Sequence, residues 1–331
     1  MDFVKEMLEK AKKSKKKLVL PEGTESRTIQ AARRLVDEGL ALEVTLLGKE
    51  AAIRDAAAKA GVKLDGIKLV DPAASGDLEA YAGEFYELRK HKGISPEDAK
   101  SALLNPLNWG AMMVRKDAAH AMVAGAENTT GDVLRAGLTI IGTVPGLKTA
   151  SSCFVMAGMD AAWGKEGCLI FSDCAVVPDP DPNQLADIAS SAAQSCREFL
   201  DTDPVVALMS FSTKGSAKHA AVEKVQNAVA ILAEKNADFI FDGELQADAA
   251  LVPSVTDKKA PGSPVRGKVN TLVFPDLGSG NIGYKLVQRL GGAEAFGPFL
   301  QGFAKPISDL SRGASVDDIV VTCAVTLSRA K

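Results

Sequence analysis

The chain has 331 residues, of which 46% are hydrophobic and 24% are charged, and its formal net charge is −3. This composition is typical of a globular protein large enough for two domains. Nucleic-acid binding is disfavoured, because the chain is not basic and only 5% of it is aromatic. No apolar run approaches the roughly 18 residues of a membrane span. The N-terminus shows no signal-peptide pattern and the five cysteines contain no C-x-x-C pair, so we expect free thiols and a cytoplasmic location.

Apolar runs typical of strands alternate with alanine-rich stretches typical of helices. The expected strands are 17–20, 43–47, 67–70, 121–124, 151–156, 168–171, 205–209, 239–242 and 271–274. The clearest helices between them are 26–39, 183–200 and 216–236. This alternation predicts an α/β fold with mostly parallel sheets, each covered by helices on both faces.

Two arginines in the first half have surroundings that suggest a role. Arg89 lies in the basic cluster 89–92, a pattern more often found on a solvated helix face. Arg135 is a lone arginine in an otherwise apolar stretch, where a buried charge would need a partner. Asp132 can supply that partner within the chain, so a structural and a ligand-binding role both remain open.

The segment Gly278–Gly283 reads G-x-G-x-x-G between an expected strand and a helix expected over 284–290. That is the context of a dinucleotide-binding fingerprint, but the acidic residue expected about 20 positions later has no clear candidate. Three interpretations remain, namely a structural turn, a phosphate-bearing ligand such as coenzyme A, and a nicotinamide cofactor. No P-loop motif is present, which disfavours ATP or GTP chemistry.

The most informative segment is 307–318, at the expected start of the last amphipathic helix. It contains Ser311, Arg312 and Asp318. A helix N-terminus presents unpaired backbone N–H groups to an anion, and Arg312 would add a phosphate donor. A second interpretation fits equally well, because the four residues from Ser315 match an S-x-x-D capping box in which Asp318 only closes the helix end.

Metal and cysteine chemistry find little support in the sequence. The three histidines, His91, His120 and His219, lie far apart in the chain and have no metal-ligand spacing. We therefore expect no metal. Cys174 follows an expected strand, but no histidine is marked as its partner, so we interpret it as structural.

The phrase S-D-L-S-R-G-x-S-x-x-D at 308–318 resembles the C-terminal signature of the phosphate acetyltransferase (phosphotransacetylase) family. Further matching segments are LVLPEG at 18–23, YELRKHKG at 86–93, TGDVLR at 130–135, DGELQADAA at 242–250 and FPDLGSGNIGYK at 274–285. Each segment is weak alone, but their order along nearly the whole chain makes the resemblance specific.

The resemblance implies reversible transfer of an acetyl group between coenzyme A and phosphate. It implies two α/β/α domains with an active-site cleft between them, the first formed by 1–143 plus 297–331 and the second by 144–296. Clusters of glycine and proline near both boundaries fit this division. A homodimer is also implied, with acetyl-CoA, phosphate and acetyl phosphate as small-molecule partners. Coenzyme A is then a substrate, and no cofactor is permanently bound.

The resemblance also implies roles for individual residues. Arg89, Arg135 and Arg312 are similar to the family's basic residues that receive the phosphate of the acyl phosphate, a task that suits the planar fork of arginine. Ser311 would donate a hydrogen bond to oxygen charge that develops on the acyl group. The implied coenzyme A site consists of Gly280, Asn281 and Arg289. A phosphate butyryltransferase and a nicotinamide-dependent dehydrogenase remain as alternatives.

Asp318 is the general base that the resemblance implies, and its ordinary acidity raises a difficulty. A thiol near 8.5 and an aspartate near 3.9 differ by about 4.6 pKa units, roughly 6 kcal/mol against proton transfer. A helix N-terminus would widen that gap. Asp318 therefore acts as a base only if burial raises its pKa or if cations lower that of the thiol. We expect direct transfer in a ternary complex, without an acyl-enzyme.

Overall fold

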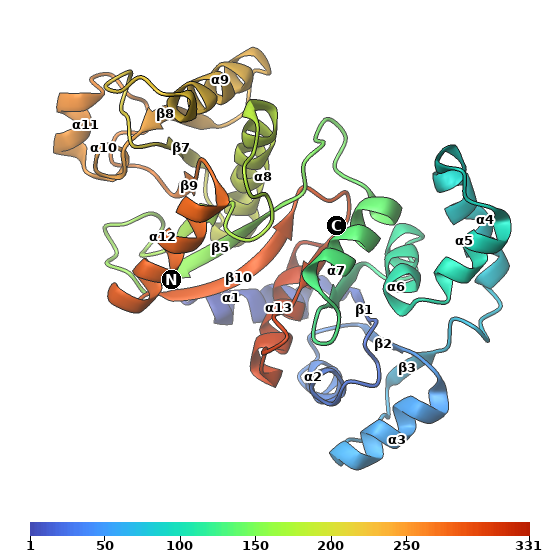
Figure 1. Ribbon diagram of the computed structural model, residues 1–331. Helices are drawn as coiled ribbons and strands as arrows, with labels where there is room; N and C mark the ends of the chain where they lie inside the picture. The colour runs from blue at the N-terminus through green and yellow to red at the C-terminus, as the bar shows by residue number, and fades with distance from the viewer. The chain divides into compact units, whose positions relative to one another are not determined.

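The computed structural model describes all residues from 1 to 331 and contains two compact units (Figure 1). The terminal unit comprises Val4–Pro145 and Phe303–Lys331, and the central unit comprises Met1–Phe3 and Gly146–Gly302. Both have sheets with mostly parallel strands and several helices, which confirms the predicted α/β class. None of the helices has the length and apolar character that crossing a membrane requires.

The terminal unit has a five-stranded parallel sheet in the order β11-β4-β1-β2-β3. Its strands are β1 (Lys17–Leu20), β2 (Glu43–Leu47), β3 (Ile67–Val70), β4 (Ala121–Ala124) and β11 (Ile307–Asp309). The first four have the predicted bounds. The strand β11 was not predicted, because three residues are too few to show a strand period.

The helices of the terminal unit are mostly short. They are α1 (Phe3–Ser14), α2 (Ser26–Asp37), α3 (Glu50–Ala60), α4 (Leu78–Arg89), α5 (Pro96–Leu103), α6 (Pro106–Arg115), α7 (Thr130–Ala136) and α13 (Val316–Ser328), with η1 (Lys90–Lys92) and the π-helical η2 (Gly137–Ile141). Two of them, α2 and α13, pack against each other and against the sheet. Ile29 and Leu35 of α2 are fully buried in this core with Ile319 of α13, and each such side chain stabilises the fold by about 1.5–3 kcal/mol.

The central unit has a six-stranded mixed sheet in the order β10-β5-β6-β9-β7-β8. Its strands are β5 (Ser151–Ala157), β6 (Leu169–Ser172), β7 (Val205–Met209), β8 (Ile240–Leu245), β9 (Thr271–Val273) and β10 (Glu294–Gln301). Its helices are α8 (Pro182–Leu200), α9 (Ala220–Glu234), α10 (Ala247–Leu251), α11 (Pro253–Lys259) and α12 (Leu277–Leu290). The strands β6 to β9 pair in parallel, whereas β5 is antiparallel to both of its neighbours.

The strand β10 occupies a segment where the glycine and proline content suggested a boundary. It is an edge strand, and its pairing with β5 is interrupted between Phe296 and Phe299. Gly297 and Pro298 fall in this interruption, where a ladder tolerates proline. The pairing continues to Gln301, so the first residues of the segment 297–331 belong to the central sheet. The functional division at 143/144 and 296/297 stays a prediction.

Candidate functional site

Three loops of the terminal unit follow neighbouring parallel strands, and parallel strands end at the same edge of a sheet. They are 21–25 after β1, 125–129 after β4 and 310–315 after β11. In open α/β sheets, ligands bind outside the carboxyl ends of the strands. These three loops, the strand-end loops, therefore form the candidate site.

A buried carboxylate fixes the second of these loops. Glu22 is only 5% exposed and accepts hydrogen bonds from the backbone N–H groups of Gly125, Ala126, Glu127 and Asn128, at 2.8 to 3.1 Å. The side-chain amide of Asn128 also donates to it, at 2.8 Å. Because one carboxylate satisfies four consecutive backbone donors, the loop has one well-defined conformation.

A second buried carboxylate, Asp309, lies at the end of β11 and is 4% exposed. Its Oδ2 atom accepts a hydrogen bond from the hydroxyl of Thr130, whereas its Oδ1 atom is buried without a hydrogen-bond partner. Burial raises the pKa of Asp309 to about 6, and the nearby charge of Glu22 adds to the increase. Gly125 lies directly beside Asp309. A Cβ on Gly125 would lie 2.5 Å from Oδ1 of Asp309, so only glycine fits at this position.

The third strand-end loop leads into α13 through a complete capping box. Ser315 Oγ accepts a hydrogen bond from the N–H of Asp318 at 3.1 Å, and the Asp318 carboxylate accepts from the N–H and the hydroxyl of Ser315, both at 2.8 Å. Asp318 therefore does close the helix end. Ser311, Arg312 and Asp318 are all exposed in the terminal unit, so a ligand can reach them.

Many arginines of the chain form ion pairs with carboxylates. Arg89, at the end of α4, Arg289, near the end of α12, and Arg312 have no carboxylate within ion-pair distance. Arg135 on α7 pairs with Asp132 at 3.1 Å, which confirms the partner suggested by the sequence. Its side chain is 74% exposed rather than buried, and a surface pair of this kind contributes only about 0–1 kcal/mol. The structure therefore leaves both roles that the sequence suggested for Arg135 open.

Comparisons with known proteins match one enzyme family along nearly the whole chain. Residues 2–327 match the model of the phosphate acetyl/butaryl transferase family. The chain belongs to this family. A phosphate acetyltransferase of Treponema pallidum is 57% identical over 330 residues, which cover 99% of this chain and 98% of that protein.

Solved structures of family members agree in fold. A phosphotransacetylase from Streptococcus pyogenes has a TM-score of 0.91 and 41% identity, covering 98% of this chain and 97% of that one. The EutD phosphotransacetylase from Staphylococcus aureus has a TM-score of 0.88 and 40% identity, covering 99% of each chain.

The glycine motif of this transferase family member lies inside a helix rather than before one. We expected the helix to begin at 284, but α12 begins at Leu277, so Gly278 to Gly283 form its first turns. A Cβ on Gly280 would lie 2.2 Å from the carbonyl oxygen of Asp173, which requires glycine at this close approach. Asn281 donates a hydrogen bond to the carbonyl oxygen of Cys174 at 3.1 Å. Both contacts favour the structural interpretation of Gly280 and Asn281 in this helix.

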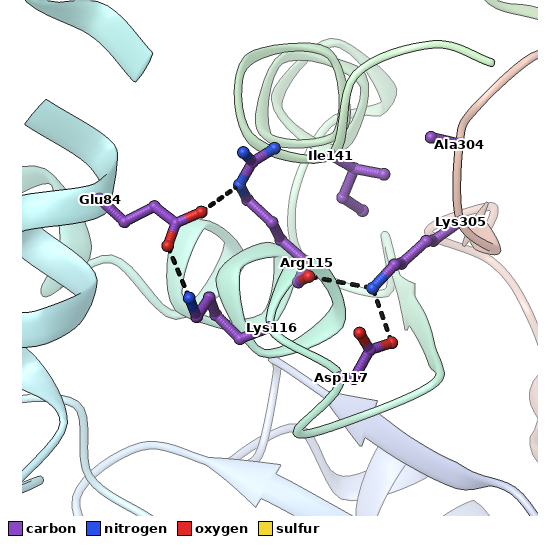
Figure 2. A pocket seen from close by; sticks show the side chains of 7 residues that line it. All are labelled: Glu84, Arg115, Lys116, Asp117, Ile141, Ala304 and Lys305. Atoms are coloured by element: carbon purple, nitrogen blue, oxygen red, sulfur yellow. Dashed lines mark hydrogen bonds and ion pairs between the residues drawn. The ribbon is translucent and has the colours of Figure 1, made fainter. Parts of the chain in front are cut away.

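A pocket of the terminal unit lined by charged residues contains none of the predicted site residues. Its volume is about 410 Å³ and its lining includes Glu84, Arg115, Lys116, Asp117 and Lys305. Figure 2 shows that its cations already have partners, because Glu84 bridges Arg115 and Lys116 while Asp117 pairs with Lys305. Because each of these cations already has a carboxylate partner, the pocket is less suited to a phosphate than Arg312 is.

Neither a metal nor a cysteine nucleophile finds support in the geometry. No three histidine, cysteine, aspartate or glutamate side chains gather in an arrangement that could hold a metal ion. Cys174 is buried, and burial raises its thiol pKa well above the ordinary value, with the charge of Asp173 adding to the effect. A reactive cysteine needs the opposite shift.

No role was predicted for Glu22, Arg27 or Asp309, although Glu22 and Asp309 lie in segments that resemble the family. A glutamate two residues after the apolar run of β1 and an aspartate at 309 are the available signals. Each is a single charged residue at a strand end. Their partners come from loops about 100 or more residues away in sequence, which no local pattern reveals.

Proposed function

We propose that the chain catalyses the reversible transfer of an acetyl group between coenzyme A and phosphate. The observation that carries this proposal is the 57% identity, over nearly the full length of both chains, to a protein named phosphate acetyltransferase. The exposed Ser311 and the unpaired Arg312 in the loop before α13 add support, because this chemistry needs a hydrogen-bond donor and a free cation.

The proposed reaction has one transfer step. The thiolate of coenzyme A attacks the carbonyl carbon of acetyl phosphate, a carbon–sulfur bond forms, and the bond from that carbon to the phosphate oxygen breaks. Arg312, with Arg89 and Arg135, holds the phosphate and stabilises its charge as it leaves. The hydroxyl of Ser311 donates a hydrogen bond to the carbonyl oxygen, which becomes negative as the thiolate attacks.

Asp318 is proposed to accept the thiol proton. The structure bears on the two routes by which an aspartate can do this. Asp318 is exposed in the terminal unit, so the route that depends on burial is not open to it. The second route remains, in which a cation such as Arg312 stabilises the thiolate and lowers the cost of deprotonation. Asp318 then serves both as helix cap and as proton acceptor.

Arg289 is proposed to bind a phosphate group of coenzyme A, since its guanidinium is exposed and has no ion-pair partner. Gly280 and Asn281 are proposed to form part of the same site, although their observed contacts are explained by packing of α12. Coenzyme A enters as a substrate. We further propose a homodimer in the cytoplasm, as the family resemblance implies.

The acyl group is the point at which the nearest alternative differs. The family model covers both acetyl and butyryl transferases, and the proposal of acetyl rests on the names of the relatives with high identity. The decisive experiment supplies coenzyme A with acetyl phosphate or butyryl phosphate and follows thioester formation by ultraviolet absorbance. Faster turnover with acetyl phosphate supports the proposal, whereas preference for butyryl phosphate selects the alternative.

Direct transfer is tested in the same reaction. Intact-protein mass spectrometry after rapid quenching should show the chain at its unmodified mass at every time point. A stable acetylated residue that forms and disappears during turnover would contradict a ternary-complex mechanism. Failure of both acyl phosphates to give a thioester would contradict the proposed function itself.

A further inference from the structure

The third strand-end loop has few contacts that hold it in place. Leu310 donates its N–H to the carbonyl oxygen of Ala124, and Ser315 is fixed by the capping box. Between them, Ser311 makes contacts only within the loop, namely its carbonyl oxygen with the N–H of Ala314 at 2.9 Å and its hydroxyl with the N–H of Gly313 at 3.3 Å. Turns of this kind are easily opened unless another part of the protein holds them.

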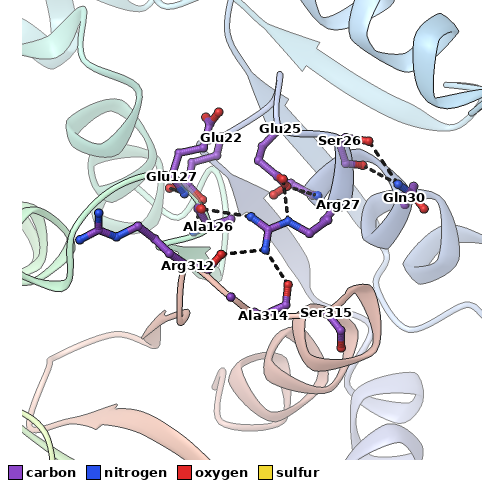
Figure 3. Close-up of polar contacts among 12 residues, drawn as sticks. Glu22, Glu25, Ser26, Arg27, Gln30, Ala126, Glu127, Arg312, Ala314 and Ser315 are labelled. Carbon is purple, nitrogen blue, oxygen red and sulfur yellow. Dashed lines mark hydrogen bonds and ion pairs between the residues drawn. The ribbon is translucent and has the colours of Figure 1, made fainter.

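One side chain holds this loop from outside. Arg27, in the first turn of α2, donates from Nη1 to the carbonyl oxygens of Arg312 and Ala314, at 2.8 and 2.7 Å. These two hydrogen bonds connect the part of the loop between Leu310 and Ser315 to another segment of the chain. Figure 3 shows the Arg312 side chain extending away from Arg27, so the contact uses the backbone of Arg312 and leaves its guanidinium available.

The other donors of Arg27 join this loop to the remaining two strand-end loops. Nη2 donates to the carbonyl oxygen of Ala126 at 3.2 Å, in the loop after β4. Nε donates to the carboxylate of Glu25 at 2.7 Å, in the loop after β1. Three loops that are far apart in sequence therefore meet on one guanidinium. Only its planar fork of five N–H donors can satisfy four acceptors in this arrangement, and a lysine ammonium has three.

Glu25 keeps this guanidinium in one orientation. Burial by itself would raise the pKa of Glu25, but hydrogen bonds from Arg27 and from the N–H of Thr28 outweigh burial and leave the pKa below its ordinary value. Glu25 is also the N-cap of α2. Arg27 is thus attached to a helix whose buried face is part of the core, so its guanidinium is held rigidly enough to position a loop.

We propose that Arg27 is a positioning residue that fixes the loop 311–313, so that the hydroxyl of Ser311 and the guanidinium of Arg312 face the reacting acyl phosphate. This inference rests on the proposed acetyl transfer for its catalytic part. Arg27 itself does not touch substrate, because four of its five N–H groups bind protein oxygens. Misplacing a catalytic group by about 1 Å can cost roughly a hundredfold in rate.

The first test compares Arg27→Ala with Arg33→Ala, a matched control on the same helix. Arg33 also donates to backbone carbonyls, those of Lys63 and Asp65, but these belong to the loop before β3 at the other end of the sheet's strands. Arg27→Ala should lower kcat roughly a hundredfold while the KM for coenzyme A stays within about twofold, and Arg33→Ala should leave both nearly unchanged. Millimolar guanidinium chloride should restore part of the kcat of Arg27→Ala. A raised KM with unchanged kcat, or equal kcat in the two variants, would overturn the proposal.

The second test does not depend on activity. Trypsin cleaves after arginine, and an ordered loop protects the bond between Arg312 and Gly313. Limited proteolysis followed by mass spectrometry should show cleavage at this bond much faster in Arg27→Ala than in wild type or in Arg33→Ala. Equal cleavage in all three proteins would overturn the positioning role. If wild type forms no thioester but its bond after Arg312 is still cleaved more slowly than in Arg27→Ala, the proposed function is contradicted and the positioning role of Arg27 is supported.

A milder variant covers the case in which Arg27→Ala does not fold. Arg27→Lys keeps the positive charge but cannot donate to both carbonyl oxygens of the loop and to Glu25 together. It should fold, show faster cleavage after Arg312 and have a reduced kcat. Wild-type values for both quantities in Arg27→Lys would contradict the requirement for a forked guanidinium.

Discussion

Two charged regions of the terminal unit use their charges in opposite ways. In the pocket of Figure 2, Glu84 pairs with Arg115 and Lys116, and Lys305 pairs with Asp117, so every cation has a carboxylate partner. In the strand-end loops, the carboxylates of Glu22 and Glu25 bind backbone donors and Arg27, while Arg312 has no ionic partner. Of these two regions, only the strand-end loops leave a cation available for a ligand.

The comparison teaches that a charge must be judged by its partners and not by the cavity around it. Surface ion pairs such as those of Glu84 have small net energies because water competes for both ions. A buried carboxylate that binds several backbone N–H groups stabilises one loop conformation. An unpaired arginine beside such a loop then keeps its full affinity for phosphate.

The largest effect on stability is expected from the loss of the buried carboxylate of Glu22. Glu22→Ala leaves four backbone N–H groups without their acceptor and should lower the free energy of unfolding by about 3 kcal/mol or more. Glu84→Ala, which removes a carboxylate from the paired region, should cost about 1 kcal/mol or less. Urea unfolding of both variants measures the difference. Equal losses would show that the two regions do not differ as the contacts indicate.

Asp309 should show an unusual dependence of stability on pH. Its pKa is about 6 in the folded protein and 3.8 ordinarily, so the folded state binds the proton more tightly. The free energy of unfolding should therefore decrease as the pH rises from 4 through 6, by about 3 kcal/mol in total. Asp309→Asn should remove this loss and be the more stable protein at pH 8. Chemical unfolding across pH 4 to 8 would show parallel curves for both proteins if the shift were absent.

Glu84 supplies the opposite case for the same experiment. Hydrogen bonds from Lys116 and then from Arg115 lower its pKa from the ordinary 4.5. Its contribution to stability is therefore present above that value and disappears as the pH falls below it. The difference in unfolding free energy between wild type and Glu84→Gln should shrink in acid. A difference that grew in acid would contradict this assignment of the ion pairs.

The smallest effect separates helix capping from catalysis at Asp318. The chain contains a matched capping box at the start of α5, where the Asp98 carboxylate accepts from the N–H and hydroxyl of Ser95 at 3.0 and 2.9 Å. Asp318→Asn and Asp98→Asn should lower the melting temperature by similar small amounts. Only Asp318→Asn should reduce kcat, by about tenfold or more, which corresponds to about 1.4 kcal/mol. Equal kcat values would leave Asp318 as a cap alone.

The sequence predicted the features that depend on local patterns. The strands β1 to β4 and β7 appear with the expected bounds, and the capping box at Ser315 is present. Local patterns were insufficient where tertiary contacts decide. The glycines before Tyr284 lie within α12, because Gly280 permits close approach to Asp173. The strand β10 forms through pairing with β5 despite its glycine and proline.

The candidate site divides in the same way. Ser311, Arg312 and Asp318 lie together in one short segment, and a motif shows them directly. Arg27 and Glu22 act through loops that are 99 or more residues away, and no spacing in the sequence marks those contacts. Roles for Arg89, Arg135, Gly280, Asn281 and Arg289 remain predictions.

The central claim is that the unpaired Arg312 binds the phosphate of the substrate, whereas the paired cations of the pocket do not. The most direct measurement is thioester formation from acetyl phosphate and coenzyme A by wild type, Arg312→Ala and the control Arg115→Ala. We predict that Arg312→Ala loses at least about a hundredfold in kcat/KM for acetyl phosphate, about 2.7 kcal/mol of transition-state stabilisation. Arg115→Ala should retain wild-type kcat/KM. Comparable activity in Arg312→Ala and wild type would contradict the account.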